Sequence, residues 1–353
     1  MKNILAKPIN IFPLLLLLLS FIIVPIACND DDDDANPDAS YRQVNLVSNV
    51  SEYGASHIDT NLVNAWGMAV GSTGAFWISS TEKEKTTIYD RDGNTLLPAI
   101  EVEGEPTGVV FNSSSDFVIP STALVSKFIY VGEDGNVVAW SAGSSTTEVA
   151  DNSSEGAVYK GVTIAQDEGS NFLYIANFSE GEIEVLDKNF NYVEKGFEDA
   201  TIPTGYAPFN IQNIDGKLYV TYALQSSDKY DDVAGAGHGY INVFNTDGTF
   251  VKRFASGGTL NSPWGITKAP SGFGQGDGNI LVGNFGDGRI NIYNSDGDYK
   301  GQLKDGDNPL TIEGLWALVF PKNGIPTGDQ NTLFFTAGPD DEEQGLFGYI
   351  HLR

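Results

Sequence analysis

The sequence predicts an all-β protein, specifically a six-bladed β-propeller over residues 41–353. One strand–turn–strand motif recurs along the chain, and helical periodicity is absent after the N-terminal segment. The composition agrees, because 40 glycines together with 15 Tyr and 20 Phe are typical of many short strands joined by tight turns.

The repeated hairpin has an alternating apolar strand, a polar residue, a turn and a second strand. Asp-Gly pairs at 92–93, 247–248 and 296–297 supply the positive φ that tight hairpins need. The predicted hairpins are TTIYDRDGNTLL (Thr86–Leu97), IEVLDKNFNYV (Ile183–Val193), INVFNTDGTFV (Ile241–Val251) and INIYNSDGDYK (Ile290–Lys300), with the polar residue at Asp90, Asp187, Asn245 and Asn294.

Upstream of these hairpins lie further strands, and the first strand of each unit contains a glycine or another small residue. Aligning these residues gives steps of 41, 53, 49, 55 and 52 residues, close to the period of propeller blades. Six such positions predict six blades: Gly67, Gly108, Gly161, Asn210, Gly265 and Ala317.

The last unit ends after three expected strands, near Trp316–Phe320, Leu333–Ala337 and Leu346–His351. The alternating segment Tyr41–Val50 has no blade of its own. We therefore expect it to add to the last blade, which closes the ring and covers a sheet edge.

The N-terminus resembles a bacterial lipoprotein signal. Residues 1–27 contain Lys2 and Lys7 and then the apolar run Ile9–Ile26, which ends at Ala27-Cys28. Pro25 stands where such motifs usually carry Leu. Cys28 is the only cysteine, so it has no disulfide partner, and we predict that it carries a lipid.

Residues 28–40 include Asp30–Asp34, a run that we interpret as a solvated tether because like charges repel. The run also resembles acidic export signals of surface-displayed lipoproteins in some Gram-negative bacteria. We therefore expect a protein held at the outer membrane, facing either the periplasm or the exterior.

The charge balance excludes one class of partner. With 47 Asp and Glu against 20 Lys and Arg, the formal net charge is -27, and duplex binding depends on basic residues that neutralise phosphates. We expect no nucleic-acid partner. Cations and neutral ligands remain compatible, and we expect a monomer.

Several long blocks of the chain are distinctive: LVNAWGMAV (Leu62–Val70), APFNIQNIDGKLYVTYA (Ala207–Ala223), DDVAGAGHGYINVFNTDG (Asp231–Gly248), SPWGITKAPSGFGQGDGNILVGNFGDGRINIY (Ser262–Tyr293) and LFFTAGPDDEEQGLFG (Leu333–Gly348). They resemble an uncharacterised family of bacterial secreted propellers related to NHL-repeat proteins. The resemblance covers nearly all of residues 41–353 and implies the propeller fold without an assigned reaction.

The central channel is the best place to seek chemistry, because the first strands of six blades converge there. Glu105, Asn210 and Glu313 offer hard oxygen donors that suit Ca²⁺, loosely similar to the metal site of gluconolactonase-like propellers. The full set of channel candidates is Asn64, Glu105, Lys160, Asn210, Ser262 and Glu313. The alternative is that these side chains cap strands and satisfy backbone groups.

Two further features are candidates. The insert Gln225–Gly239 interrupts the repeat and carries Asp231, Asp232 and His238, a candidate rim or calcium site. Trp66, Trp264 and Trp316 occupy equivalent or adjacent repeat positions. They would form either an aromatic floor for a ring-shaped ligand or packing between blades.

No HExxH, Walker A, GxSxG or paired CxxC motif occurs. We therefore favour a non-catalytic module that binds a protein, carbohydrate or small molecule. The alternative is a Ca²⁺-dependent hydrolase or lactonase at the channel, which fold analogy alone does not establish.

Overall fold

The computed structural model describes residues 39–321 and 330–353. The predicted signal segment 1–27, Cys28 and the tether up to Asp38 lie outside the described residues. Ala39 and Ser40 lie against the propeller: Ala39 is buried, and Ser40 Oγ accepts a hydrogen bond from the amide of Gly306.

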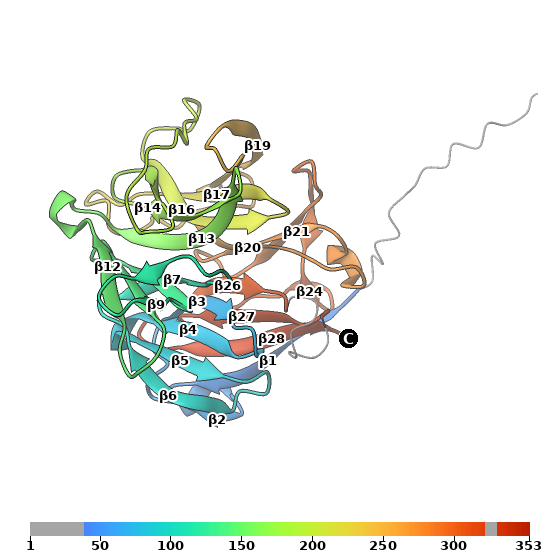
Figure 1. Ribbon diagram of the computed structural model, residues 1–353. Helices are drawn as coiled ribbons and strands as arrows, with labels where there is room; N and C mark the ends of the chain where they lie inside the picture. Colours follow the sequence, from blue (N-terminus) through green and yellow to red (C-terminus); the bar gives the residue numbers. More distant parts are fainter. Residues whose placement is uncertain (1–38, 322–329) are drawn as a thin grey trace, which may run out of the picture. The chain divides into compact units, whose positions relative to one another are not determined.

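Six antiparallel sheets form the six blades, which confirms the predicted fold (Figure 1). Blade 1 contains β3 (Ala65–Val70), β4 (Phe76–Ser80), β5 (Lys85–Tyr89) and β6 (Thr95–Glu101). Blade 2 contains β7 (Pro106–Phe111), β10 (Phe128–Gly132), β11 (Asn136–Trp140) and β12 (Thr147–Asp151). Blade 3 contains β13 (Tyr159–Asp167), β14 (Ser170–Asn177) and β15 (Glu182–Leu186).

The second half of the ring follows the same order. Blade 4 contains β16 (Tyr206–Ile214), β17 (Lys217–Leu224), β18 (Tyr240–Phe244) and β19 (Phe250–Ser256). Blade 5 contains β20 (Pro263–Lys268), β21 (Ile280–Asn284), β22 (Ile290–Tyr293) and β23 (Tyr299–Gln302). Blade 6 contains β26 (Leu315–Val319), β27 (Leu333–Ala337), β28 (Leu346–Leu352), β1 (Tyr41–Ser48) and β2 (His57–Ile58).

Small elements decorate the loops. Two short hairpins are β8 (Val118–Ile119) with β9 (Leu124–Val125), and β24 (Lys304–Asp305) with β25 (Asn308–Pro309). In residues 39–321 and 330–353 the helical turns are 3-10: η1 (Ser51–Tyr53), η2 (Thr81–Lys83), η3 (Ser153–Glu155) and η4 (Gly274–Gly276). Within the described ranges, no helix has the length and apolar character needed to cross a membrane.

The N-terminal strand closes the ring as expected. β1 pairs antiparallel with β28 from Tyr41 opposite Leu352 to Ser48 opposite Leu346. Tyr41 is fully buried, and its hydroxyl donates to the carbonyl of Phe273 in blade 5. The free side of β1 is then covered by the short parallel strand β2.

The aligned glycines mark the closest approach between neighbouring inner strands. A β-carbon added to Gly67 would lie 2.3 Å from the carbonyl oxygen of Thr107, and one added to Gly265 would lie 2.5 Å from the carbonyl oxygen of Trp316. Real atoms do not approach so closely. The repeat therefore encodes how tightly each blade packs against the next.

The third blade departs from the predicted pattern. The sequence predicts a hairpin over Ile183–Val193, and its turn forms, with hydrogen bonds from the amide of Asp187 to the carbonyl of Asn191 and from the amide of Val193 to the carbonyl of Val185. The return strand, however, is reduced to a single bridge between Leu186 and Tyr192. The matching turns of the other hairpins have Gly93, Gly248 and Gly297 at positive φ, whereas this turn has Phe190 at φ 64°. The chain then leaves the blade, so blade 3 has three strands.

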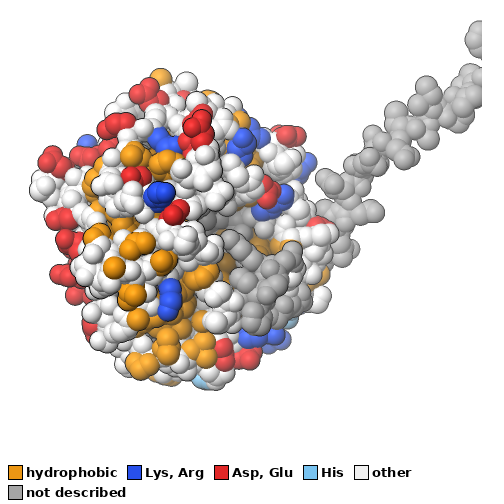
Figure 2. Space-filling view, in the orientation of Figure 1, with side chains coloured by type: hydrophobic (Ala, Val, Ile, Leu, Met, Phe, Trp, Pro, Cys, Tyr) orange, Lys and Arg blue, Asp and Glu red, His pale blue; other side chains and the backbone are white. Residues whose placement is uncertain are grey.

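The visible face carries acidic and basic side chains with apolar patches between them (Figure 2). The aligned polar turn residues are also explained locally. The side chain of Asp90 accepts hydrogen bonds from the amides of Asp92 and Asn94, and Asn294 does the same for Asp296 and Asp298. Such turns stabilise hairpins without any ligand.

Candidate functional site

Polar residues gather at the end of the channel where the inner strands begin. Asn64, Glu105 and Ser262 precede β3, β7 and β20, and all three have left-handed backbones, with φ of 47°, 51° and 46°. Such a backbone costs about 1–3 kcal/mol outside glycine and is typical of sites that need an unusual side-chain direction. Lys160, the second residue of β13, lies among them.

Lys160 is the centre of the cluster. Its side chain is 2% exposed and its ammonium forms an ion pair with Glu133, from the turn between β10 and β11. The ammonium also lies 4.0 Å from a carboxylate oxygen of Asp231. Three aromatic rings surround it, with centroids 5.2 Å away for Trp66, 5.9 Å for Phe178 and 5.0 Å for Tyr230. Rings in this position stabilise a buried cation.

Carboxylates outnumber this single cation. Burial raises the pKa of Glu133, and the charge of Glu105 raises it further, although Lys160 acts in the opposite direction. Burial also raises the pKa of Asp232, against the opposing effect of Lys160. The pKa of Glu342 is raised to about 7, chiefly by burial and then by the charge of Glu133. The cluster is therefore short of positive charge.

Hydrogen bonds connect this cluster to the tryptophans in the centre of the ring. Asn64 donates from Nδ2 to Glu342 at 2.7 Å, and Trp316 Nε1 donates to Asn64 Oδ1 at 2.9 Å. Trp264 Nε1 donates to the carbonyl of Lys160. The cluster consequently rests on a rigid apolar base.

The three predicted tryptophans pack against one another. Trp66 stacks on Trp316 with ring centroids 3.8 Å apart, and Trp264 meets both rings edge-on. Each is at most 4% exposed. This geometry is packing between blades rather than an open aromatic floor.

A buried polar atom in this region has no partner among the described residues. Trp66 Nε1 is buried without a hydrogen bond. Ser262 Oγ and Asp232 Oδ2 are also buried, but a hydrogen bond from the Ser262 side chain acts to lower the pKa of Asp232. Buried polar atoms are normally paired with protein or water. Trp66 Nε1, whose ring lies beside the Lys160 ammonium, departs from this rule.

The structure brings together part of the set that the sequence predicts. Asn64, Glu105, Lys160, Asp231 and Asp232 belong to the Lys160 cluster, which also includes Ser262. Glu105 accepts a hydrogen bond from the hydroxyl of Tyr230 at 3.0 Å. The insert Gln225–Gly239 thus contacts Glu105 and Lys160 through Tyr230 and Asp231.

Three other predicted residues make hydrogen bonds outside the Lys160 cluster. Asn210 donates to the carbonyl of Trp264, and Glu313 accepts from the amide of Asp340. His238 binds the carbonyl of Val233 through Nδ1. Glu105, Asn210 and Glu313 thus each make a contact with a different partner among the described residues, and a Ca²⁺ site formed by these three residues stays a prediction.

Sequence reasoning missed Glu133, Tyr230 and Glu342. Glu133 lies in a β10–β11 turn that resembles an ordinary hairpin turn, and Glu342 lies in the acidic loop before β28. Tyr230 is inside the insert that interrupts the repeat, which is the one signal that pointed toward it. The other two carry no local signal, because their burial depends on contacts with distant blades.

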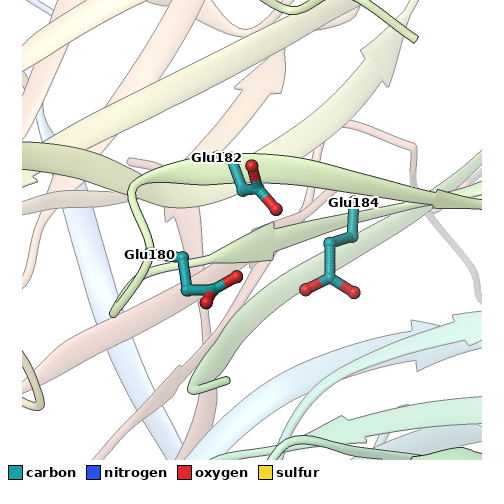
Figure 3. A group of neighbouring side chains, drawn as sticks. All are labelled: Glu180, Glu182 and Glu184. Carbon is teal, nitrogen blue, oxygen red and sulfur yellow. The ribbon is translucent and has the colours of Figure 1, made fainter. Parts of the chain in front are cut away.

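A second acidic group lies on blade 3. Ligand oxygens of Glu180, Glu182 and Glu184 lie within 4.8 Å of one another (Figure 3). Glu184 is buried and already accepts hydrogen bonds from Asn152, Asn177 and Tyr159, at 2.9, 2.6 and 2.6 Å. Because both carboxylate oxygens of Glu184 already accept hydrogen bonds within the protein, the three glutamates are not by themselves a metal site.

We expect the stability of the protein to depend on Glu342 above about pH 4.5. The pKa of Glu342 is raised from 4.5 to about 7, so between these values the folded protein binds more protons than the unfolded chain. The free energy of unfolding therefore falls as the pH rises through this window. Replacing Glu342→Gln should stabilise the protein by up to about 2–3 kcal/mol near pH 8 and have little effect near pH 4.

Denaturant unfolding at a series of pH values tests this expectation. Glu343→Gln is the matched control, because Glu343 is the exposed neighbour of Glu342. An unchanged pH dependence in Glu342→Gln would contradict the assignment.

Fold and site together define a six-bladed β-propeller with a buried ion-pair cluster at one end of its channel. No family model matches the chain. It is 36% identical over 326 residues to uncharacterized protein R648 of Acanthamoeba polyphaga mimivirus, covering 86% of this chain and 78% of that protein. It is 35% identical over 318 residues to uncharacterized protein L690 of the same virus, covering 84% and 82%. The chain belongs to the same protein family as R648 and L690.

Solved structures agree on the fold. A structure of streptogramin B lyase matches with a TM-score of 0.53 at 13% identity, covering 89% of this chain and 98% of that one. A gluconolactonase from Xanthomonas campestris matches with a TM-score of 0.51 at 14% identity, covering 83% of this chain and 87% of that one. A protein of unknown function from Bacteroides thetaiotaomicron matches with a TM-score of 0.57 at 12% identity, covering 89% of this chain and 76% of that one. These likenesses show the propeller alone.

The relatives found by sequence are mimivirus proteins. The comparisons thus support the propeller part of the expected family resemblance, and they do not support its bacterial, secreted part.

Proposed function

We propose that this chain is a non-catalytic binding module that takes a small cationic ligand, such as a protonated amine, at the Lys160 cluster. The observation that carries the proposal is the charge imbalance there. Five carboxylates interact electrostatically with one another or with the single ammonium of Lys160: those of Glu105, Glu133, Asp231, Asp232 and Glu342. A second cation would relieve this repulsion.

The cluster is open to solvent on one side. The side chain of Asp231 is 71% exposed, and Glu105 is exposed as well. Buried Glu133 and the aromatic rings of Trp66 and Phe178 lie behind them. A ligand can therefore meet carboxylates at the surface while the base of the site stays rigid, which limits the entropy lost on binding.

A bound amine suits these residues better than a divalent metal ion. A divalent ion between Glu133 and Asp231 would meet the positive charge of Lys160, whereas an amine can bind the exposed carboxylates of Glu105 and Asp231 and leave Lys160 in place. A hydrolase of the lactonase type needs a metal ion that polarises a carbonyl group, and the donors predicted for it, Glu105, Asn210 and Glu313, are engaged separately. We therefore prefer binding to hydrolysis.

We also propose that the chain is exported and anchored through a lipid on Cys28. This proposal rests on the apolar run Ile9–Ile26 and on the small residue before Cys28. The binding face would then be held at a membrane of the cell envelope.

Calorimetric titration with a linear diamine, putrescine, tests the binding proposal. We expect binding near pH 8 that weakens by about tenfold near pH 5, where Glu342 is protonated. The double variant Asp231→Asn with Glu342→Gln should bind putrescine about tenfold more weakly near pH 8, since both changes remove a negative charge from the site.

Glu52→Gln serves as the charge-matched control, because Glu52 is exposed in η1 before blade 1. Equal binding by all variants would refute the site. A heat of binding in the titration with CaCl₂, and none in the titration with putrescine, would favour the metal-dependent alternative instead.

A further inference from the structure

Blade 3 leaves one edge of its sheet open. β14 pairs with one side of β15, while the other side is joined only near its end, where the carbonyl of Val185 accepts from the amide of Val193. Residues alternate along a strand, so the amide and carbonyl of Ile183 point to the same free side as that carbonyl. Neither has a hydrogen-bond partner among the described residues.

Contacts with the inner strands of blade 3 and with blade 4 hold away the segment that would otherwise become the fourth strand. Lys195 forms an ion pair with Asp167 and lies 4.1 Å from the ring centroid of Phe172. Phe197 packs edge-on against Tyr174 and against Phe244 of β18. These contacts draw residues after Val193 into the seam between blades 3 and 4.

A second anchor follows a few residues later. Asp199 pairs with Arg253 of β19 and also accepts from Asn242 of β18. The pKa of Asp199 is lowered to about 2, chiefly by hydrogen bonds from Thr201 and Arg253 that overcome its desolvation. The segment is therefore fixed on blade 4 at neutral pH, and the edge of β15 stays free.

A cavity of about 510 Å³ lies along this edge. Its lining combines the edge strand with the displaced segment: Asn152, Glu182–Val185 and Tyr192–Glu198. Glu182, Glu194 and Glu198 are exposed. The one lysine in the lining, Lys195, is already paired with Asp167. The pKa of Glu182 is raised by its partial burial and by the charges of Glu180, Glu184 and Glu194.

We propose that this cavity receives an extended segment of a partner protein that carries Lys or Arg side chains and adds to β15 as the fourth strand of blade 3. The free amide and carbonyl of Ile183 supply backbone hydrogen bonds, as in other cases of strand addition. The glutamates select basic side chains by charge complementarity. The chain's own Asp30–Asp34 run has the wrong charge for this cavity.

This site is separate from the Lys160 cluster, so it is tested independently. The probe is a fluorescent peptide of about eight residues in which Lys and Thr alternate, a length typical of a strand. Fluorescence polarisation with the full chain should show saturable binding. Hydrogen exchange of the amides of Ile183 and Val185 should slow when the peptide is present.

Variants and a modified peptide separate strand addition from simple charge attraction. Glu182→Lys with Glu194→Lys should weaken binding by about tenfold or more, whereas Glu52→Lys, on an exposed residue of η1, should change it less than about twofold. The same peptide with N-methylated Thr residues keeps its charge but loses backbone donors, so it should also bind at least about tenfold more weakly.

Three results would overturn the proposal. The first is equal binding of the N-methylated peptide. The second is equal loss in the Glu52→Lys control. The third is a concentration-dependent dimer that protects Ile183 and Val185 without any peptide, which would assign the edge to a second copy of the chain.

Discussion

Replacing Trp316→Ala is expected to lower the free energy of unfolding by about 3–5 kcal/mol. Trp316 is 1% exposed and its ring is stacked between Trp66 and Phe285, with centroids 3.8 and 3.9 Å away. Its removal leaves a cavity at the centre of the ring, where several blades meet and cannot close around it. Denaturant titration followed by fluorescence measures the change.

Two milder changes in the same stack serve as controls. Trp316→Phe keeps a ring but removes the hydrogen bond to Asn64, so it should cost about 1–3 kcal/mol. Trp66→Phe should cost less, because Trp66 Nε1 has no hydrogen-bond partner among the described residues. The reverse order for the two Phe variants would contradict the hydrogen-bond assignment.

Removing residues 41–48 from the full chain is expected to abolish stable folding. This deletion takes away β1, in which Tyr41 and Val47 are fully buried and Leu46 is 5% exposed. Each buried side chain of this size contributes about 1.5–3 kcal/mol, and a typical protein has only about 5–15 kcal/mol in total. The deletion also exposes the edge of β28.

Circular dichroism and light scattering should report lost cooperativity and aggregation. Adding a peptide with the sequence of residues 41–50 should restore part of the fold, since it can pair with β28 in trans. Cooperative unfolding of the deleted chain at its usual midpoint would show that the ring closes without β1.

The channel cluster and the open edge of blade 3 have a common origin. Both occur where a segment departs from the repeat. The insert Gln225–Gly239 brings Tyr230 and Asp231 close to Lys160. The segment after Val193 leaves the outer edge of β15 without a neighbouring strand. Variation of this kind is how a repeated scaffold acquires individual sites.

The sequence alone determined the number of blades and the way they close. Most units carry their own turn residues, and four have a glycine in the inner strand that lies against the next inner strand: Gly67, Gly108, Gly161 and Gly265. The pairing of β1 with β28 followed from an alternating segment that lacked a blade of its own. Such features are local or repeated, so a single chain displays them directly.

Only the tertiary structure decided which polar side chains meet. Glu133 and Glu342 lie far from Lys160 in the chain and reach it because loops of blades 2 and 6 end at the same channel. Asn210 instead turns to the carbonyl of Trp264. Likewise, Phe190 stands where the other hairpins have glycine. The loss of the fourth strand, however, depends on contacts of Lys195 with blade 3 and of Phe197 and Asp199 with blade 4. Burial and charge coupling arise from contacts between blades, which the repeat pattern does not encode.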